Sequence, residues 1–165
     1  MSTIATHTRF RTLMSRFITG VTVIAVASPD RPSGVAAMTA SAVCPVSLTP
    51  LMLLFCLRNE SSLLPCLKES EKFSVNVLSS GQDAVSRYYG GQPYRGTAGA
   101  WDLDAASAPL LGGANATFVC RVASLQKLGD HHIVVGEVVD MHSIDPPAPA
   151  LIYAAGRYLD VELAS

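Results

Sequence analysis

The feature that most constrains this chain is a segment without a single charged side chain, from Pro32 to Leu57. A helix of that length is long enough to cross a bilayer. Gly34, Pro45 and Pro50 interrupt the segment, and serine and threonine residues are spread along it. Backbone groups left unpaired beside the prolines would be costly in lipid. The segment therefore predicts two buried strands joined by a loop, and no membrane span.

The composition predicts one ordinary domain over residues 1–165, located in the cytoplasm. Hydrophobic residues make up 49% of the chain and charged residues only 15%, against roughly 25% charged in an average soluble domain. This balance excludes intrinsic disorder. The net charge of −1 provides no basic field for nucleic acid or anionic lipid, and the N-terminal residues lack the apolar segment of a signal peptide. We expect a second copy of the chain, in a homodimer, to cover the remaining apolar surface.

The four cysteines predict neither a metal site nor a disulfide framework. Cys44, Cys56, Cys66 and Cys120 form no C-x-x-C pair and no zinc spacing, and each has apolar neighbours. Free cysteine packs like a small hydrophobic residue. We therefore expect four buried, reduced thiols.

Hydrophobic periodicity predicts strands over most of the chain. Phe10, Leu13, Met14 and Phe17 recur at helical spacing, which predicts one short helix that ends by Gly20. The apolar run over 51–57 is typical of a strand buried on both faces. Strands are expected over residues 21–27, 35–43, 51–57, 73–78, 116–128, 132–142 and 151–153, short helices over 61–68 and 82–89, and loops over 45–50 and 90–115.

These elements favour a mainly β fold with peripheral α-helices, in the form of a six-stranded antiparallel Greek-key barrel. Strands and helices do not alternate regularly along the chain, as they would in a parallel α/β sheet. The sequence also lacks the G-x-G-x-x-G and G-x-x-x-x-G-K-[ST] motifs. Dinucleotide-binding α/β folds and P-loop folds are therefore disfavoured.

Two polar clusters lie where predicted strands end. Thr39, Ala40 and Ser41 are small residues that would let a ligand lie close to the backbone, or would simply fill a tapered barrel interior. The second cluster, residues 58–62, follows a buried strand and opens a helix with Ser61 or Ser62 as N-cap. Free amides at a helix start, hydroxyl groups and an arginine can bind an anion, although many such serines only cap their helix.

A third polar cluster, Gly129-Asp130-His131-His132, forms a hairpin tip between two long strands. His131 can steer a substrate or transfer a proton near neutral pH, or it is an ordinary surface histidine at a turn. Adjacent strand residues point to opposite faces, so the two histidines are not expected to share a metal. The chain contains no G-x-S-x-G nucleophile motif. If the protein is an enzyme, we expect a bound cofactor to supply the chemistry.

The order of the motifs resembles the flavin reductase-like family, which includes the small NAD(P)H:flavin oxidoreductase components of two-component monooxygenases. The resemblance covers roughly residues 10 to 160 and is strongest at Gly129-Asp-His. The matching motifs are F-x-x-G-V-T-V-I over 17–24, G-x-x-x-M-T-A-S over 34–41, V-S-L-x-P over 46–50, F-x-V-N-V-L over 73–78, G-D-H-x-I-x-x-G-E-V over 129–138 and L-I-Y-x-x-G-x-Y over 151–158.

The resemblance implies an FMN-binding split barrel that works as a homodimer and holds flavin near the subunit interface. By position, Thr39, Ala40 and Ser41 would lie along the flavin ring and ribityl chain. His131 would face the nicotinamide. The residues implied at the flavin phosphate are Arg58, Asn59, Ser61 and Ser62, and those implied to close the pocket are Arg157 and Tyr158.

The function implied is reduction of FMN or FAD by NADH or NADPH, with reduced flavin supplied to a separate oxygenase and no metal. Two alternatives remain open: an oxidase or electron-transfer protein that holds FMN tightly on the same barrel, and a dimeric flavin-binding module without catalysis. The chain departs from many relatives at Leu51, where they have a second proline, and at Cys44. The sequence distinguishes neither FMN from FAD nor NADH from NADPH.

Overall fold

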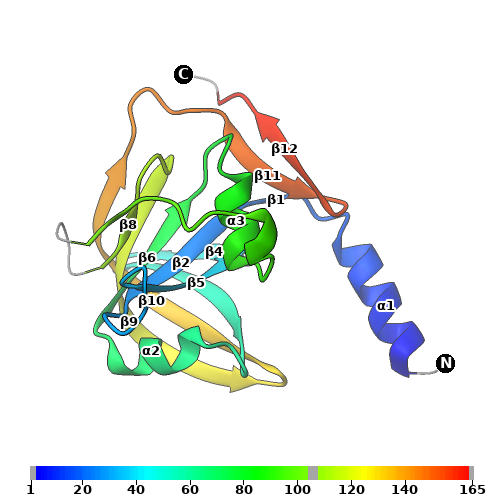
Figure 1. The fold of residues 1–165 in the computed structure, drawn as a ribbon. Helices are drawn as coiled ribbons and strands as arrows, with labels where there is room; N and C mark the ends of the chain where they lie inside the picture. Colours follow the sequence, from blue (N-terminus) through cyan, green and yellow to red (C-terminus); the bar gives the residue numbers. More distant parts are fainter. Residues whose placement is uncertain (1–2, 104–107, 164–165) are drawn as a thin grey trace.

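The computed structural model describes residues 3–103 and 108–163, and its centre is one antiparallel sheet of seven strands in the order β3-β2-β6-β9-β10-β5-β4 (Figure 1). Strands β3 and β4 stand at opposite ends of this order, yet only residues 41 and 42 separate them in sequence. The sheet is therefore strongly curled, and its two ends come close together at residues 41 and 42, although β3 and β4 do not pair with each other. The strands are β2 (Thr22–Ala27), β3 (Val35–Ala40), β4 (Val43–Leu48), β5 (Leu51–Arg58), β6 (Lys72–Val77), β9 (Ala116–Leu128) and β10 (His131–Ser143).

The predicted fold class, mainly β with antiparallel strands, is confirmed, but the sheet has one strand more than the six expected. The additional strand is β4, which covers most of the predicted loop over 45–50. Pro45 is compatible with this strand because β4 is an edge strand, and the register shifts between Pro45 and Ser47. The expectation that residues 51–57 are buried on both faces is wrong: Leu53, Phe55 and Leu57 are buried, while the residues between them are only half-buried.

The core lies on the concave side of the sheet and centres on two aromatic rings. Phe55 and Phe73 meet edge to face with ring centroids 5.5 Å apart, and both are fully buried. Gly136 faces them, because a Cβ at this position would lie 2.5 Å from Cζ of Phe73. Helix α2 (Leu63–Glu69) contributes three buried leucines to the same core.

The cysteines are free, as predicted, but they are not all buried. Cys120 is buried opposite Phe73, and burial raises the pKa of its thiol to about 12. Cys56 and Cys66 are half-buried. Cys44 is exposed, contrary to expectation, because it lies on edge strand β4.

A smaller sheet of β1 (Thr19–Gly20), β11 (Ala150–Ala154) and β12 (Arg157–Val161) lies beside helix α3 (Asp83–Tyr89) (Figure 1). A second apolar cluster, which includes Val23, Val85 and Leu151, fills the space between these elements. Strand β12 was not predicted, since the last expected strand ends at residue 153. The predicted loop over 90–115 also contains a 3₁₀ turn, η1 (Pro93–Arg95), and a short hairpin of β7 (Trp101–Asp102) and β8 (Leu110–Leu111).

Helix α1 (Thr3–Met14) projects away from the sheets (Figure 1). The predicted helix is present, but it ends at Met14, before Phe17. Its apolar side chains are largely uncovered: Phe10 is 65% exposed, and Phe17 beyond the helix end is 69% exposed. None of the helices in the described residues is long and apolar enough to span a membrane.

Candidate functional site

Two adjoining cavities lie along the outer side of β3, next to the C-terminal end of α3. We call them together the β3 groove. The first, of about 320 Å³, is lined by Met38, Thr39, Arg58, Glu60, Ser61, Tyr89 and Gly90. The second, of about 150 Å³, is lined by Val21, Thr39, Ser41, Ser86, Gly90, Tyr153 and Tyr158. Because both cavities share Thr39 and Gly90, they form one continuous surface from Arg58 to Tyr158.

Strand alternation divides the predicted cluster Thr39-Ala40-Ser41 between two faces. Thr39 and Ser41 line the β3 groove, whereas Ala40 is buried in the main core. The Thr39 hydroxyl donates a hydrogen bond of 2.6 Å to the carbonyl of Ser86 on α3. This bond fixes the last turn of α3 against β3 and leaves the lone pairs of the Thr39 hydroxyl for other donors.

Gly90 keeps the middle of the groove open. A Cβ at this position would lie 2.9 Å from the Ser86 carbonyl oxygen and 3.8 Å from the Thr39 hydroxyl oxygen. A larger residue would therefore press on α3 and narrow both cavities. Sequence reasoning identified Gly90 only as the end of a helix, although its position next to Gly91 was a signal of close approach.

The arginine end of the groove is formed where β5 meets α2. Arg58 is exposed there, and the Ser61 hydroxyl accepts a hydrogen bond of 3.3 Å from the backbone N–H of Leu63. Ser62 is the N-cap residue of α2, but it makes no side-chain capping bond and does not line the groove. The predicted cluster is therefore only partly brought together.

Asn59 connects this end to the hairpin tip at 129–130. Its backbone N–H donates to the Asp130 carbonyl at 3.0 Å, and its side-chain amide donates to the Gly129 carbonyl at 3.1 Å. The Oδ1 atom of Asn59 is buried and has no hydrogen-bond partner in the part of the chain described. Asn59 lines neither cavity of the β3 groove, so it supports the Arg58 end from behind through its bonds to the hairpin tip.

His131 lies directly opposite Arg58 in the pairing of β10 with β5, but it does not line the β3 groove. Its Nδ1 atom is 2.7 Å from Oδ1 of Asp130. The hydrogen bond to His131, followed by the charge of that ring, lowers the pKa of the Asp130 carboxyl. Asp130 therefore orients the His131 ring at the mouth of the arginine end.

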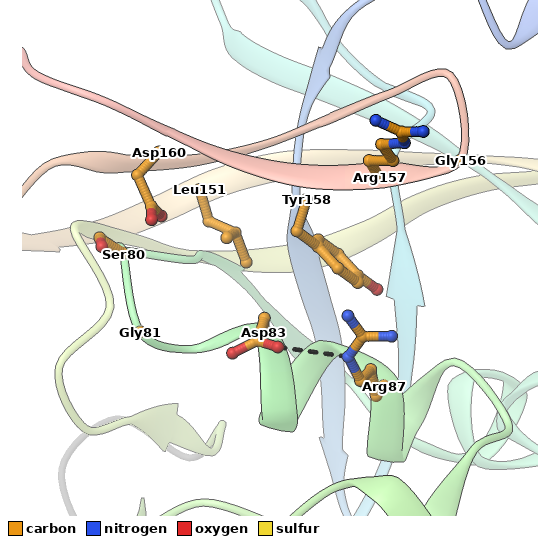
Figure 2. A pocket seen from close by; sticks show the side chains of 9 residues that line it. All are labelled: Ser80, Gly81, Asp83, Arg87, Leu151, Gly156, Arg157, Tyr158 and Asp160. Carbon is orange, nitrogen blue, oxygen red and sulfur yellow. Dashed lines mark hydrogen bonds and ion pairs between the residues drawn. The ribbon is translucent and has the colours of Figure 1, made fainter.

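A third cavity of about 520 Å³ adjoins the groove through Tyr158 and contains Arg87 and Arg157 (Figure 2). The Tyr158 hydroxyl lies 2.9 Å from Oγ of Ser86, and the Arg87 guanidinium lies 4.7 Å from the Tyr158 ring centroid. Arg87 also donates from Nε to Asp83 at 3.2 Å. Figure 2 shows Tyr158 directed toward Arg87, while Arg157 points away from it. Of the predicted pair, only Tyr158 lines the β3 groove.

Sequence reasoning missed the contribution of α3 to this site. Ser86, Tyr89 and Gly90 line the groove, and Arg87 holds the Tyr158 ring. The helix was predicted, but periodicity within one segment does not reveal which distant strand its end will contact.

The chemistry of the groove suits a largely neutral ligand with one anionic end. Hydroxyl groups and an aromatic ring line the part near Ser41 and Tyr158. At the other end the Arg58 guanidinium supplies a cation, and the Glu60 carboxylate lines the same cavity. Flavin mononucleotide has this distribution of an uncharged ring, hydroxyl groups and a phosphate. In the described residues, no three His, Cys, Asp or Glu side chains come together as a metal site.

Comparison with known proteins matches this architecture to one family. The family model for the flavin reductase like domain matches residues 14–162. The chain is 36% identical over 155 residues to the FMN reductase (NADH) RutF of Variovorax paradoxus, with 92% of this chain and 84% of that protein covered.

Solved structures agree with the sequence relatives. Flavin reductase PheA2 superimposes with a TM-score of 0.84 at 29% identity, over 99% of this chain and all of that chain. BorF, the flavin reductase component of a bacterial two-component tryptophan halogenase, gives 0.82 at 30% identity, over 96% and 99% of the two chains. Family model, sequence relatives and fold all agree, and the chain belongs to the flavin reductase-like family.

Proposed function

We propose that this protein is an NAD(P)H-dependent flavin reductase, which passes a hydride from the nicotinamide to FMN or FAD and supplies reduced flavin to a separate oxygenase. The observation that carries the proposal is the β3 groove, which joins a cation at Arg58 to the neutral hydroxyl groups of Thr39 and Ser41. The FMN reductase (NADH) relatives support the reaction.

In this proposal the chain binds and orients the reactants and contributes no nucleophile. Arg58 and Ser61 bind the flavin phosphate, where a guanidinium forms charge-assisted hydrogen bonds. Thr39 and Ser41 lie along the ring and ribityl chain. Asn59 serves the phosphate end by joining it to the hairpin tip through its bonds to Gly129 and Asp130. Bound flavin supplies the redox chemistry, since its ring system takes up the hydride. Holding the two rings in contact is the main catalytic contribution of the protein.

His131 is proposed as a residue that orients the nicotinamide carboxamide. Asp130 holds Nδ1 of the ring at 2.7 Å, which leaves Nε2 as the atom available to a substrate. Ala40 contributes only backbone to the flavin site, since its side chain is in the core. Ser62 and Arg157 lie outside the groove, so we propose for them at most contacts with parts of a ligand that extend beyond it.

The exposure of the groove to solvent supports the proposal that reduced flavin is released as a product. Arg58 and Ser41 are exposed, so the ligand can exchange with solvent without an opening of the core. Similarity to reductase components such as BorF supports a separate oxygenase partner. We further propose a homodimer of single-domain chains in the cytoplasm. The exposed apolar side chains of α1, among them Ile4 at 79% and Phe10 at 65%, support a second copy as their cover.

The test is oxidation of NADH and of NADPH by the purified protein, followed at 340 nm with FMN or FAD added. We expect turnover that requires flavin and that a His131→Ala variant slows, with a larger change in KM for NADH than for flavin. A rate no greater than that of free flavin with NADH would contradict the reductase function. A yellow protein that only an external partner reduces would support an electron-transfer flavoprotein instead.

A further inference from the structure

A further cavity of about 580 Å³ lies next to the arginine end of the β3 groove, and neither the reaction nor the predicted site residues use it. We call it the Tyr88 cavity. It is lined by Arg31, Pro32, Ser33, Val35, Ala37, Tyr88, Tyr89, Gly91, Pro93 and Ala98. Tyr89 also lines the cavity that contains Arg58 and Ser61. The two spaces are therefore separated by one shared side chain.

The Tyr88 cavity continues the groove along the same face of β3. Val35 and Ala37 line the cavity, and Thr39, the next residue on the same face of the strand, lines the groove together with Met38. Strand residues rise about 3.3 Å each, which places Ala37 about 7 Å from Thr39. A ligand whose phosphate is held at Arg58 has this cavity as the neighbouring space, since Tyr89 lines both cavities.

The aromatic wall of the cavity is fixed in place. The rings of Tyr88 and Tyr89 meet edge to face, with centroids 4.9 Å apart. The Tyr89 hydroxyl donates to the Ala98 carbonyl at 3.0 Å and accepts a hydrogen bond of 2.9 Å from Nε1 of Trp101. Tyr88 is thus held by a neighbour that is itself anchored, and its ring is a preformed surface for stacking.

The guanidinium of Arg31 provides a positive charge in the lining of the same cavity. The residue is exposed, and its guanidinium forms no ion pair within residues 3–103 and 108–163. The lining residues that the structure describes include no carboxylate to neutralise it. An aromatic wall beside an unneutralised arginine suits a heteroaromatic base that carries a phosphate.

We propose that the Tyr88 cavity binds the adenosine phosphate half of a dinucleotide, with the base on Tyr88 and the phosphate at Arg31. This inference rests on the proposed function, because it assumes that a flavin phosphate lies at Arg58. FAD differs from FMN by an adenylate on that phosphate, so FAD is the source that the position of the cavity favours. NADH contains the same adenosine phosphate chemistry and is the other source. Because the cavity adds contacts to the adenylate of FAD that FMN lacks, the protein binds FAD more tightly than FMN.

The test is a titration of the full-length protein with FAD, FMN and NADH, for the wild type and the variants Arg31→Ala, Tyr88→Ala and Tyr88→Phe. Loss of stacking predicts that Tyr88→Ala weakens FAD binding roughly tenfold and leaves FMN binding unchanged, while Tyr88→Phe retains FAD affinity. Arg31→Ala is expected to reduce FAD affinity by about threefold to tenfold. Because Arg31 is exposed, this variant tests the cavity even if Tyr88→Ala misfolds.

Tyr94→Ala and Arg95→Ala are matched controls. Tyr94 is 78% exposed, the Arg95 guanidinium lies 5.4 Å from its ring centroid, and neither residue lines the cavity. Both controls should bind FAD like the wild type. If the Arg31 and Tyr88 variants raise KM for NADH and leave FAD binding unchanged, the adenylate comes from NADH.

Two outcomes overturn the inference, and they differ in what they say of the reductase function. If FMN and FAD bind equally and all variants retain wild-type affinity for FAD and NADH, the cavity takes no adenylate while the reductase function stands. If wild-type protein binds neither flavin nor NADH, both proposals fail together.

Discussion

The two faces of β3 differ in what they do for the protein, although they belong to one strand of six residues. Ala36 and Ala40 face the main core, where they are at most 6% exposed. Thr39 and, just beyond the strand, Ser41 face the β3 groove. The first face stabilises the fold through apolar burial, and the second offers hydroxyl groups to a ligand. Changes on the core side should therefore mainly alter stability. Changes in the groove should mainly alter binding, except where a groove side chain also holds α3, as Tyr158 and Thr39 do through Ser86.

The largest expected effect is on the core side, at Phe73. Phe73 is fully buried against Phe55 and beside Gly136. We expect Phe73→Ala to lower the free energy of unfolding by about 3–5 kcal/mol, because it leaves a cavity that the sheet cannot close. Urea denaturation followed by circular dichroism measures the change. Tyr94→Ala, at a side chain that is 78% exposed and in no proposed interface, is the control and should stay within about 0.5 kcal/mol of the wild type.

In the groove, Arg58→Ala should change binding and not stability. Removal of the guanidinium is expected to weaken FMN about tenfold, or about 1.4 kcal/mol. Riboflavin, which lacks the phosphate, should bind both proteins equally, and so should FMN in the control variant Arg9→Ala. Flavin fluorescence quenching measures the dissociation constants. An equal loss of riboflavin and FMN binding would show that Arg58 does not contact the phosphate.

Tyr158→Phe tests the junction between groove and smaller sheet. The variant loses only the hydroxyl that lies 2.9 Å from Ser86, and keeps the ring under Arg87. One hydrogen bond corresponds to about 1 kcal/mol of stability. Thermal unfolding should show that decrease in stability. The control variant is Tyr153→Phe, because the Tyr153 ring packs on Tyr158 with centroids 5.1 Å apart. This control should lower stability less than Tyr158→Phe. A wild-type melting temperature for Tyr158→Phe would mean that the hydroxyl does not connect the two elements.

The smallest expected effect depends on pH and involves Asp130. Its pKa is lowered in the folded protein, mainly by the hydrogen bond to His131. A carboxyl with a lowered folded pKa stabilises the fold at pH values above its unfolded pKa of about 3.9, and this contribution is lost as the pH falls through the folded value. The melting temperatures of wild type and Asp130→Asn should differ slightly at pH 7, and between pH 7 and pH 3 this difference should begin to shrink only once the pH falls below about 3.9. A constant difference across this range would exclude the carboxylate as its cause.

The sequence predicted the core better than the groove, for a physical reason. Alternation over residues 73–78 predicted a strand, and β6 confirms that strand, although residues 73–76 are all buried and not only the apolar ones among them. Edge strand β4 escaped prediction because Pro45 marks a loop in most contexts, and only the position of β4 at the sheet edge makes it tolerable.

The groove depends on contacts between distant segments, which local patterns do not contain. Thr39 and Ser41 were identified from residue type, since hydroxyl groups stand out in an uncharged segment. The contact of Thr39 with Ser86 joins residues 47 positions apart. Sequence patterns therefore predicted one wall of the site but not the α3 wall that completes it.

The most direct test of the account is a crystal structure of the protein with FMN. We expect the phosphate within hydrogen-bonding distance of Arg58 and Ser61, with the ring and ribityl chain against Thr39 and Ser41. Flavin bound elsewhere, for example in the apolar groove of about 410 Å³ between Leu48 and Met141, or with its phosphate at the Tyr158 end, would contradict the assignment of the β3 groove as the flavin site.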